Sequence, residues 1–307
     1  MTASRKDVNL YDLVNPEDPK AVSQEVRYLL SLMGPGACIS FLDQAFSDVR
    51  RIYQGSYQGL RASNTRYHDL THALAVYLAL ARLCHGAMLS GEKLGPRPII
   101  LCLAAALFHD IGFIQAEGDD QGTGAKHMIG HEERSMAFAR DYLLDKGFSP
   151  RDADDCAAMI QCTELDVSVD DAAFSSAETA LAGRLLAAGD LLAQVADRMY
   201  LEKLLLLYRE FQEAGIGGYD TELMLLEKTE NFYEHQVKRR IQKECRGVDR
   251  FLRPHFQERW NMDRDLYADA VRKNLDYLSD VLKDYRDNYR NRLRRGGIVM
   301  QLGREGN

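Results

Sequence analysis

Phe108-His109-Asp110-Ile111-Gly112 closes the longest apolar run of the chain, which begins at Ile99. A run that is apolar on every face predicts a helix at the buried centre of a helical bundle. The His109-Asp110 doublet at its end is costly to bury unless its nitrogen and oxygen atoms have partners, and a divalent cation is a common partner. A satisfied hydrogen bond inside the core is the alternative.

The stretch Arg66-Tyr67-His68-Asp69-Leu70-Thr71-His72-Ala73 places two imidazoles four residues apart. If this stretch is helical, both side chains project from one face. Thr71 is expected to cap the helix that follows it. His72, His131 and Asp190 lie in predicted helical segments before and after the doublet. With these three further potential ligands, we prefer a metal site to a core hydrogen bond.

The predicted helix over residues 178–196 is mostly apolar. A line of polar residues begins on it. Asp190, Gln194 and Asp197 fall at i, i+4 and i+7 along it. Such a line either faces solvent or lines a site. Because leucines flank it, we favour a site, and Gln194 and Asp197 become candidates for a substrate pocket.

Helical spacing recurs along the chain, and strand alternation of useful length is absent. We therefore expect an all-α protein built as a single large helical bundle. An irregular N-terminal arm is expected over residues 1–20, an all-helical domain over 21–292 and a basic flexible tail over 293–307. Six arginines against one Asp occur between residues 286 and 304, and a solvated helix end is preferred to an anion-binding tail. The predicted helices cover residues 21–33, 37–53, 72–84, 99–110, 131–144, 149–163, 178–196, 202–214, 221–243, 248–260 and 265–292.

The composition of the 307-residue chain fits a soluble globular protein, with 46% hydrophobic residues. Its formal net charge of −7, from 39 basic and 46 acidic residues, argues against a protein that coats nucleic acid or an anionic membrane. We expect neither a nucleic-acid nor a membrane partner. The sequence leaves a homo-oligomer open.

The cysteines form no Cys-x-x-Cys pair and are scattered through helical patterns, so we expect reduced thiols. The stretch from Met1 to Pro19 is polar and lacks the apolar core of a signal peptide. The longest apolar run is about half the length that a membrane span requires. These features predict a cytoplasmic protein. The six cysteines are Cys38, Cys84, Cys102, Cys156, Cys162 and Cys245.

A lone His, a His-Asp doublet that closes an apolar helix and a distant Asp inside another helix form an ordered set. This set resembles the HD-domain superfamily of metal-dependent phosphohydrolases. Tyr67-His68 with His72-Ala73 is more specifically similar to the opening motif of class I cyclic-nucleotide phosphodiesterases. The resemblance covers roughly residues 60–200. It implies an HD-type core there, with additional helices over 201–292.

By this resemblance the metal ligands map onto His72, His109, Asp110 and Asp190. Asp110 would bridge two ions in a two-metal member, and His131 is the candidate ligand of the second ion. The cofactor would be a divalent cation, one of Mn, Mg, Fe, Zn, Co or Ni, with one site expected and a second left open.

The implied activity is hydrolysis of a small phosphate ester by metal-activated water, as a phosphomonoesterase or phosphodiesterase. A nucleotide is the first candidate for the substrate. Asp110 would be catalytic as a metal ligand. His68 would be catalytic as the general acid that protonates the leaving oxygen, the role of the corresponding His in the phosphodiesterases.

Two positions depart from these families. Phe113 stands where the phosphodiesterase pattern has a further His and the HD-GYP proteins have a Lys. Residues 161–164 lack the His that HD proteins with a fuller second-metal set carry there, although Glu164 or Glu132 could substitute. His127 lies on a glycine-rich loop and is expected to be exposed.

Two other classes of function remain open. An HD-type di-iron oxygenase builds similar helices and ligands but needs a fuller set of His ligands. A metal- or nucleotide-binding module without turnover is the third class, and a coordination sphere closed by protein would favour it. Iron content and oxygen uptake separate the oxygenase from the hydrolase.

Overall fold

The computed structural model describes residues 8–34 and 39–305. Residues 1–7 of the predicted arm lie outside these ranges. So do residues 35–38, which include the predicted start of the second helix and one cysteine, and residues 306–307 of the predicted tail.

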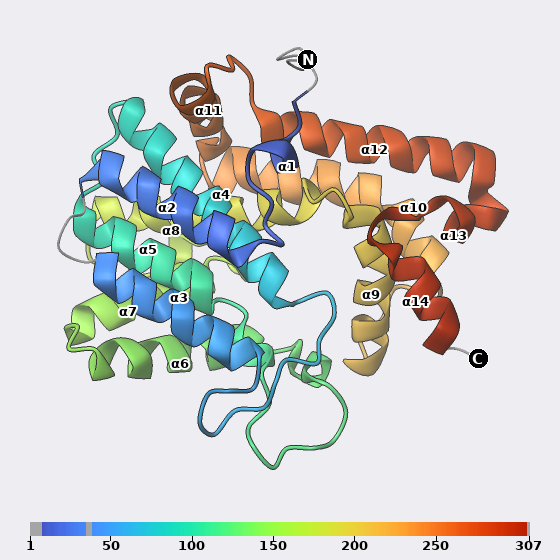
Figure 1. Cartoon of the computed structure of the whole chain (residues 1–307), viewed down its shortest axis with the longest axis horizontal. Coiled ribbons are helices and arrows are strands. Elements are labelled where there is room, and N and C mark those ends of the chain that lie inside the picture. Colours follow the sequence, from blue (N-terminus) through green and yellow to red (C-terminus); the bar gives the residue numbers. More distant parts are fainter. Residues whose placement is uncertain (1–7, 35–38, 306–307) are drawn as a thin grey trace.

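The described chain is built from helices (Figure 1). The one β-type contact within the described ranges is an isolated bridge between Leu60 and Ala116. The prediction of an all-α protein is confirmed.

Three helices form the centre of the molecule: α4 (Leu70–Leu89), α5 (Pro96–Phe108) and α8 (Ala177–Val195). They pack on one another, and most of their side chains are buried because their sequences are apolar on most faces. The stretches Leu70–Leu89 and Pro96–Phe113 are long and apolar enough to cross a membrane by length and composition, but 83% of each is buried inside the protein. Core packing accounts for their composition.

Five further helices surround this centre and lie with it on one side of the molecule in Figure 1. α2 packs on α3 and α4, α3 on α5, and α11 on α4, while α6 and α7 pack on each other and on α5. These helices are α2 (Pro19–Met33), α3 (Ile39–Tyr53), α6 (His131–Asp145), α7 (Pro150–Gln161) and α11 (Leu252–Trp260).

A second group of helices follows α8 and lies on the other side in Figure 1. α9 packs on α10, α12 and α14, and α12 also packs on α8, which joins the two groups. The helices are α9 (Tyr200–Glu213), α10 (Glu222–Phe232), α12 (Leu266–Tyr285), α13 (Tyr289–Arg292) and α14 (Ile298–Glu305).

Two predicted helices are less regular than their sequences suggest. The helix predicted over 221–243 is α-helical only in α10 and continues as two π-helical segments, Tyr233–Val237 and Arg240–Glu244. The helix predicted over 265–292 is interrupted after α12 by a 3₁₀ turn, Arg286–Asn288.

The chain ends contain more helix than predicted. In the N-terminal arm, α1 (Leu10–Leu13) packs on α12. In the tail, α14 packs on α9 and buries Leu302, so the expectation of a flexible tail is corrected for its described residues. Arg290 before it donates to Glu222, with 2.6 Å between Nη2 and Oε2, and so holds two helices together.

The start of α4 differs from the prediction in a way that matters for the site. Its N-cap is Asp69 and not Thr71, because Asp69 Oδ1 accepts a hydrogen bond from the His72 backbone N–H at 2.9 Å. His72 therefore lies in the first turn, whereas His68 precedes the helix. The two imidazoles do not share a helical face.

The cysteines of the described chain agree with the expectation of reduced thiols, because all are buried and none forms a disulfide; they are Cys84, Cys102, Cys156, Cys162 and Cys245.

Candidate metal centre

The His-Asp doublet lies where α5 ends and a short 3₁₀ helix, η2 (Ile111–Phe113), begins. Gly112 lets this turn approach the start of α6 closely. A Cβ atom at Gly112 would lie 1.9 Å from the carbonyl oxygen of His131, which no side chain could tolerate without a shift. Its backbone N–H donates to Ser135 Oγ at 2.9 Å. The glycine thus brings the doublet and His131 together.

Four side chains come together at this point: His72 from α4, Asp190 from α8 and the two residues of the doublet. The ligand atoms of His72, His109 and Asp110 all lie within 4.8 Å of one another. The Nε2 atoms of His72 and His109 are 3.4 Å apart, and His109 Nε2 is 3.3 Å from Asp110 Oδ2. Asp190 Oδ1 lies 3.1 Å from His72 Nε2 and 3.6 Å from His109 Nε2. Ligands that bind one ion at about 2.0–2.2 Å lie roughly 3.0–3.6 Å apart, so His72, His109 and Asp110 fit a single cation, and Asp190 lies beside the two imidazoles.

The hydrogen bonds around the cluster leave the correct atoms available to a metal ion. His109 Nδ1 donates to the Ala106 carbonyl oxygen at 2.9 Å, so the lone pair of Nε2 points into the cluster. Asp110 Oδ2 is buried and has no hydrogen-bond partner among the described residues. A buried carboxylate oxygen without a donor is costly, and a cation at this point would satisfy it.

The charges of the cluster also favour a cation. Burial lowers the pKa of His109, but the carboxylates of Asp110 and Asp190 raise it by more, to about 9. Burial raises the pKa of Asp110, yet His109 and the neighbouring imidazoles hold it well below its usual range. Two buried carboxylates therefore stabilise positive charge among these side chains. A buried His72, His109 and Asp110 group that could hold a metal ion agrees with the sequence prediction, which left the metal's identity open.

The second oxygen of Asp110 faces another imidazole. Asp110 Oδ1 is 3.6 Å from Nε2 of His131, whose Nδ1 lies 2.8 Å from the Met128 carbonyl oxygen. Donation from Nδ1 leaves Nε2 free as a ligand. Phe113, which replaces a donor in the related patterns, stacks on both His68 and His131, with ring centroids 4.3 and 4.2 Å apart.

His68 is held by a residue that sequence reasoning missed. Its Nδ1 atom lies 2.7 Å from Glu210 Oε2, and Oε1 of Glu210 accepts the backbone N–H groups of Arg66 and Tyr67, each at 2.7 Å. Burial lowers the pKa of His68, but the hydrogen bond to Glu210 and its charge raise it above the usual value overall. Glu210 lies on α9 in a mostly polar stretch, residues 209–213, and nothing in that pattern distinguishes it from its neighbours.

A cavity of about 610 Å³ opens above the cluster. It is lined by all five predicted metal ligands, by His68 and by Gln194, which donates to the Tyr67 hydroxyl. Glu132 and Glu164 also line it.

Two predicted features of the pocket are corrected. Asp197 is not among the lining residues, because α8 ends at Val195 and the helical spacing no longer holds. Its carboxylate instead binds Lys203 Nζ at 2.6 Å. His127 is partly buried rather than exposed and lies 3.6 Å from Asp119 through its Nε2 atom.

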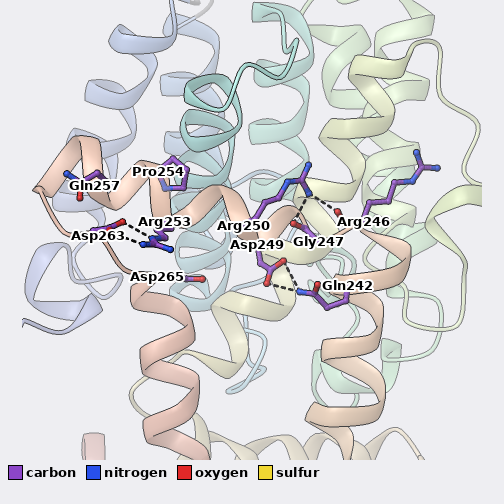
Figure 2. A pocket seen from close by; sticks show the side chains of 10 residues that line it. All are labelled: Gln242, Arg246, Gly247, Asp249, Arg250, Arg253, Pro254, Gln257, Asp263 and Asp265. Atoms are coloured by element: carbon purple, nitrogen blue, oxygen red, sulfur yellow. Dashed lines mark hydrogen bonds and ion pairs between the residues drawn. The ribbon is translucent and has the colours of Figure 1, made fainter.

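A larger surface depression of about 820 Å³ lies near α11 and shares no lining residue with the metal cavity (Figure 2). Figure 2 shows that two of its arginines are already engaged. Arg253 binds Asp263 through two hydrogen bonds of 2.7 and 2.8 Å, and Arg250 donates to the carbonyl oxygens of Arg246 and Gly247. No imidazole of the described residues lines this larger depression, so the candidate metal ligands lie in the smaller cavity.

A family model described as Npun_R2479-like matches residues 55–253 of the chain. This range contains every candidate metal ligand as well as His68 and Glu210. No curated protein and no solved structure matches the chain significantly.

Proposed function

The chain belongs to the Npun_R2479-like family, and from the residues inside the matched range we propose that it is a metal-dependent phosphohydrolase of HD-domain type. The observation that carries the proposal is the buried His72, His109 and Asp110 group, with Asp190 beside it, in the same cavity as His68, which Glu210 holds. A metal site alone would serve a binding module equally well. A buried imidazole with a raised pKa in the same cavity adds a group that can donate a proton.

The ligand set supports this reaction class. His72, His109, Asp110 and Asp190 would hold the first ion, and Asp110 Oδ1 with His131 Nε2 would contribute to a second. A divalent ion bound there supplies Lewis acidity, which polarises a phosphoryl oxygen and lowers the pKa of bound water. Asp110 Oδ1 and Oδ2 face different imidazoles, so one carboxylate could serve both ions.

His68 would supply the proton that the leaving oxygen needs. Because Nδ1 faces the Glu210 carboxylate, the Nε2–H of the imidazolium is the proton that can be transferred. Stacking on Phe113 fixes the plane of the ring, and Glu210 stabilises the charged form before transfer. An alkoxide is a poor leaving group, so this proton matters most for esters of ribose or other alcohols.

The substrate would be a small phosphate ester, with a nucleotide as the first candidate. The cavity volume of about 610 Å³ suits a ligand of that size. Phe211 and Tyr219 line the cavity, and their rings stack on each other with centroids 5.6 Å apart. They offer aromatic surface on which a nucleobase could pack.

The test is a phosphate-release screen across nucleotides and sugar phosphates with Mn, Mg, Co, Ni and Fe(II), run beside the Asp110→Ala variant. The proposal predicts release by the wild-type protein with at least one metal and no release by the variant. Oxygen consumption with Fe(II), without phosphate release on any ester, would replace the hydrolase by the oxygenase. Tight ligand binding without either reaction would show that the protein is a binding module.

A further inference from the structure

Part of the lining of the cavity above the metal cluster is an apolar wall. This wall comes from α9 and α10 and the loop between them, helices that follow α8 in the chain and lie together in Figure 1. Apolar ligand surface that is buried against such a wall contributes favourably to the binding free energy. Its apolar members are Leu204, Leu207, Phe211, Ile216, Leu225 and Phe232.

Apolar side chains also line the mouth of the cavity. Ile129 is 80% exposed and Leu165 is 47% exposed, although both are large aliphatic residues. They come from two loops that lead into α6 and out of α7. Exposed apolar residues at the rim of a pocket commonly mark a surface that a ligand covers. The apolar character of the wall therefore continues to the entrance.

The charges of the cavity oppose a second phosphate. Among the described lining residues, Lys228 is the only Lys or Arg. One of its three donors is engaged, because Nζ donates to the Gly218 carbonyl oxygen at 2.8 Å. Three further carboxylates besides Asp110 and Asp190 line the same cavity: Glu132, Glu164 and Asp166. A polyphosphate tail would meet these carboxylates with Lys228 as the single Lys or Arg among the described lining residues to compensate them.

We propose that the ligand of this cavity carries a single phosphoryl group on an apolar or aromatic body. This inference rests on the proposed function only in assigning the phosphoryl group to the metal end. The wall and rim bind the body, and the surplus carboxylates exclude ligands with a second phosphate. A nucleoside monophosphate belongs to this class, and a nucleoside triphosphate does not.

Three stable phosphonates test the class without hydrolysis. Titration calorimetry on the metal-loaded protein would compare 1-naphthylmethylphosphonate, hydroxymethylphosphonate and propane-1,3-bisphosphonate. We expect the naphthyl compound to bind at least about tenfold more tightly than the hydroxymethyl compound, because its ring buries apolar surface. The bisphosphonate should bind no more tightly than the hydroxymethyl compound.

Two rim variants locate the apolar contact. Ile129→Ser and Leu165→Ser should weaken naphthyl binding by roughly threefold or more and leave hydroxymethyl binding unchanged. Leu89→Ser and Leu144→Ser are matched controls, because these leucines are 47% and 46% exposed and do not line the cavity. The controls should bind all three compounds as the wild-type protein does.

Equal affinities for the naphthyl and hydroxymethyl compounds, tightest binding of the bisphosphonate, or no binding of any compound would each overturn the inference. So would rim variants that bind the naphthyl compound normally. The outcome of the phosphate-release screen is independent of these binding measurements. Selective naphthyl binding without phosphate release from any ester would overturn the hydrolase and support the ligand class.

Discussion

The Nδ1 atom of His68 lies 2.7 Å from the Oε2 atom of Glu210, although 142 positions separate the two residues. The same carboxylate accepts the backbone N–H groups of Arg66 and Tyr67 and so fixes the segment that carries His68. Glu210 is 6% exposed, and its charge therefore acts with little screening by water. It positions His68 and favours its protonated form.

Glu210→Gln should move the alkaline limb of the kcat/KM profile to lower pH. The hydrogen bond and charge of Glu210 raise the pKa of His68 against the effect of burial. The general acid must be protonated, so activity is lost as the pH rises through this pKa. Without the charge, the pKa falls and the loss begins at lower pH.

Glu213→Gln, one turn further along α9, is the control. Glu213 binds Thr123 and does not line the cavity. If the alkaline limb is unchanged in Glu210→Gln, or moves equally in both variants, Glu210 does not control the protonation of His68.

His68→Ala should affect two phosphate esters differently. An ester with an alkyl leaving group needs protonation, and positioned general-acid help is typically worth ~10²–10⁴-fold. p-Nitrophenol leaves as an anion without it, so p-nitrophenyl phosphate should lose little. The measurement compares kcat on both esters at unchanged metal content. Equal losses, or loss of metal, would assign His68 to positioning or ligation.

His131→Ala should lower the metal-to-protein ratio by about one if His131 serves a second ion, while the first ion stays bound. Gly112→Ala should have the same effect without removing a ligand, because its Cβ would displace the backbone of His131. Crowding of this kind also costs roughly 1–3 kcal/mol of stability, which thermal unfolding would detect.

Gly303→Ala is the matched control for the glycine, because a Cβ at Gly303 meets no atom within 4 Å. An unchanged metal ratio in His131→Ala would make His131 a residue of the helix start only. An unchanged ratio in Gly112→Ala alone would show that the backbone can adjust.

The His72, His109 and Asp110 group, which could hold a metal ion, could be predicted from the sequence because its His-Asp doublet lies in a strong local pattern. His109 and Asp110 close an apolar helix, and Asp190 interrupts another, so these polar residues stand out where burial is expected. The all-α fold could be predicted for the same reason, since apolar residues recur at helical spacing.

Residues that act through tertiary contacts could not be predicted in this way. Glu210 reaches His68 only because α9 packs beside the segment before α4, and its own helix shows no distinguishing pattern. Asp197 was misplaced because regular spacing was extended past the end of α8. The sequence predicts Thr71 as the cap of α4, and only the backbone geometry shows that Asp69 takes this role.

Metal content tests the central claim most directly. The purified wild-type protein and its Asp110→Ala variant, both loaded with Mn and dialysed, would be compared by elemental analysis, with His127→Ala as an imidazole control outside the cavity. We predict at least one ion per chain in the wild-type protein and in His127→Ala. Asp110→Ala should lose the ion, because the variant lacks the carboxylate of the His72, His109 and Asp110 group, and it should keep its helical circular dichroism. Stoichiometric metal in folded Asp110→Ala, or none in the wild-type protein, would contradict the metal centre.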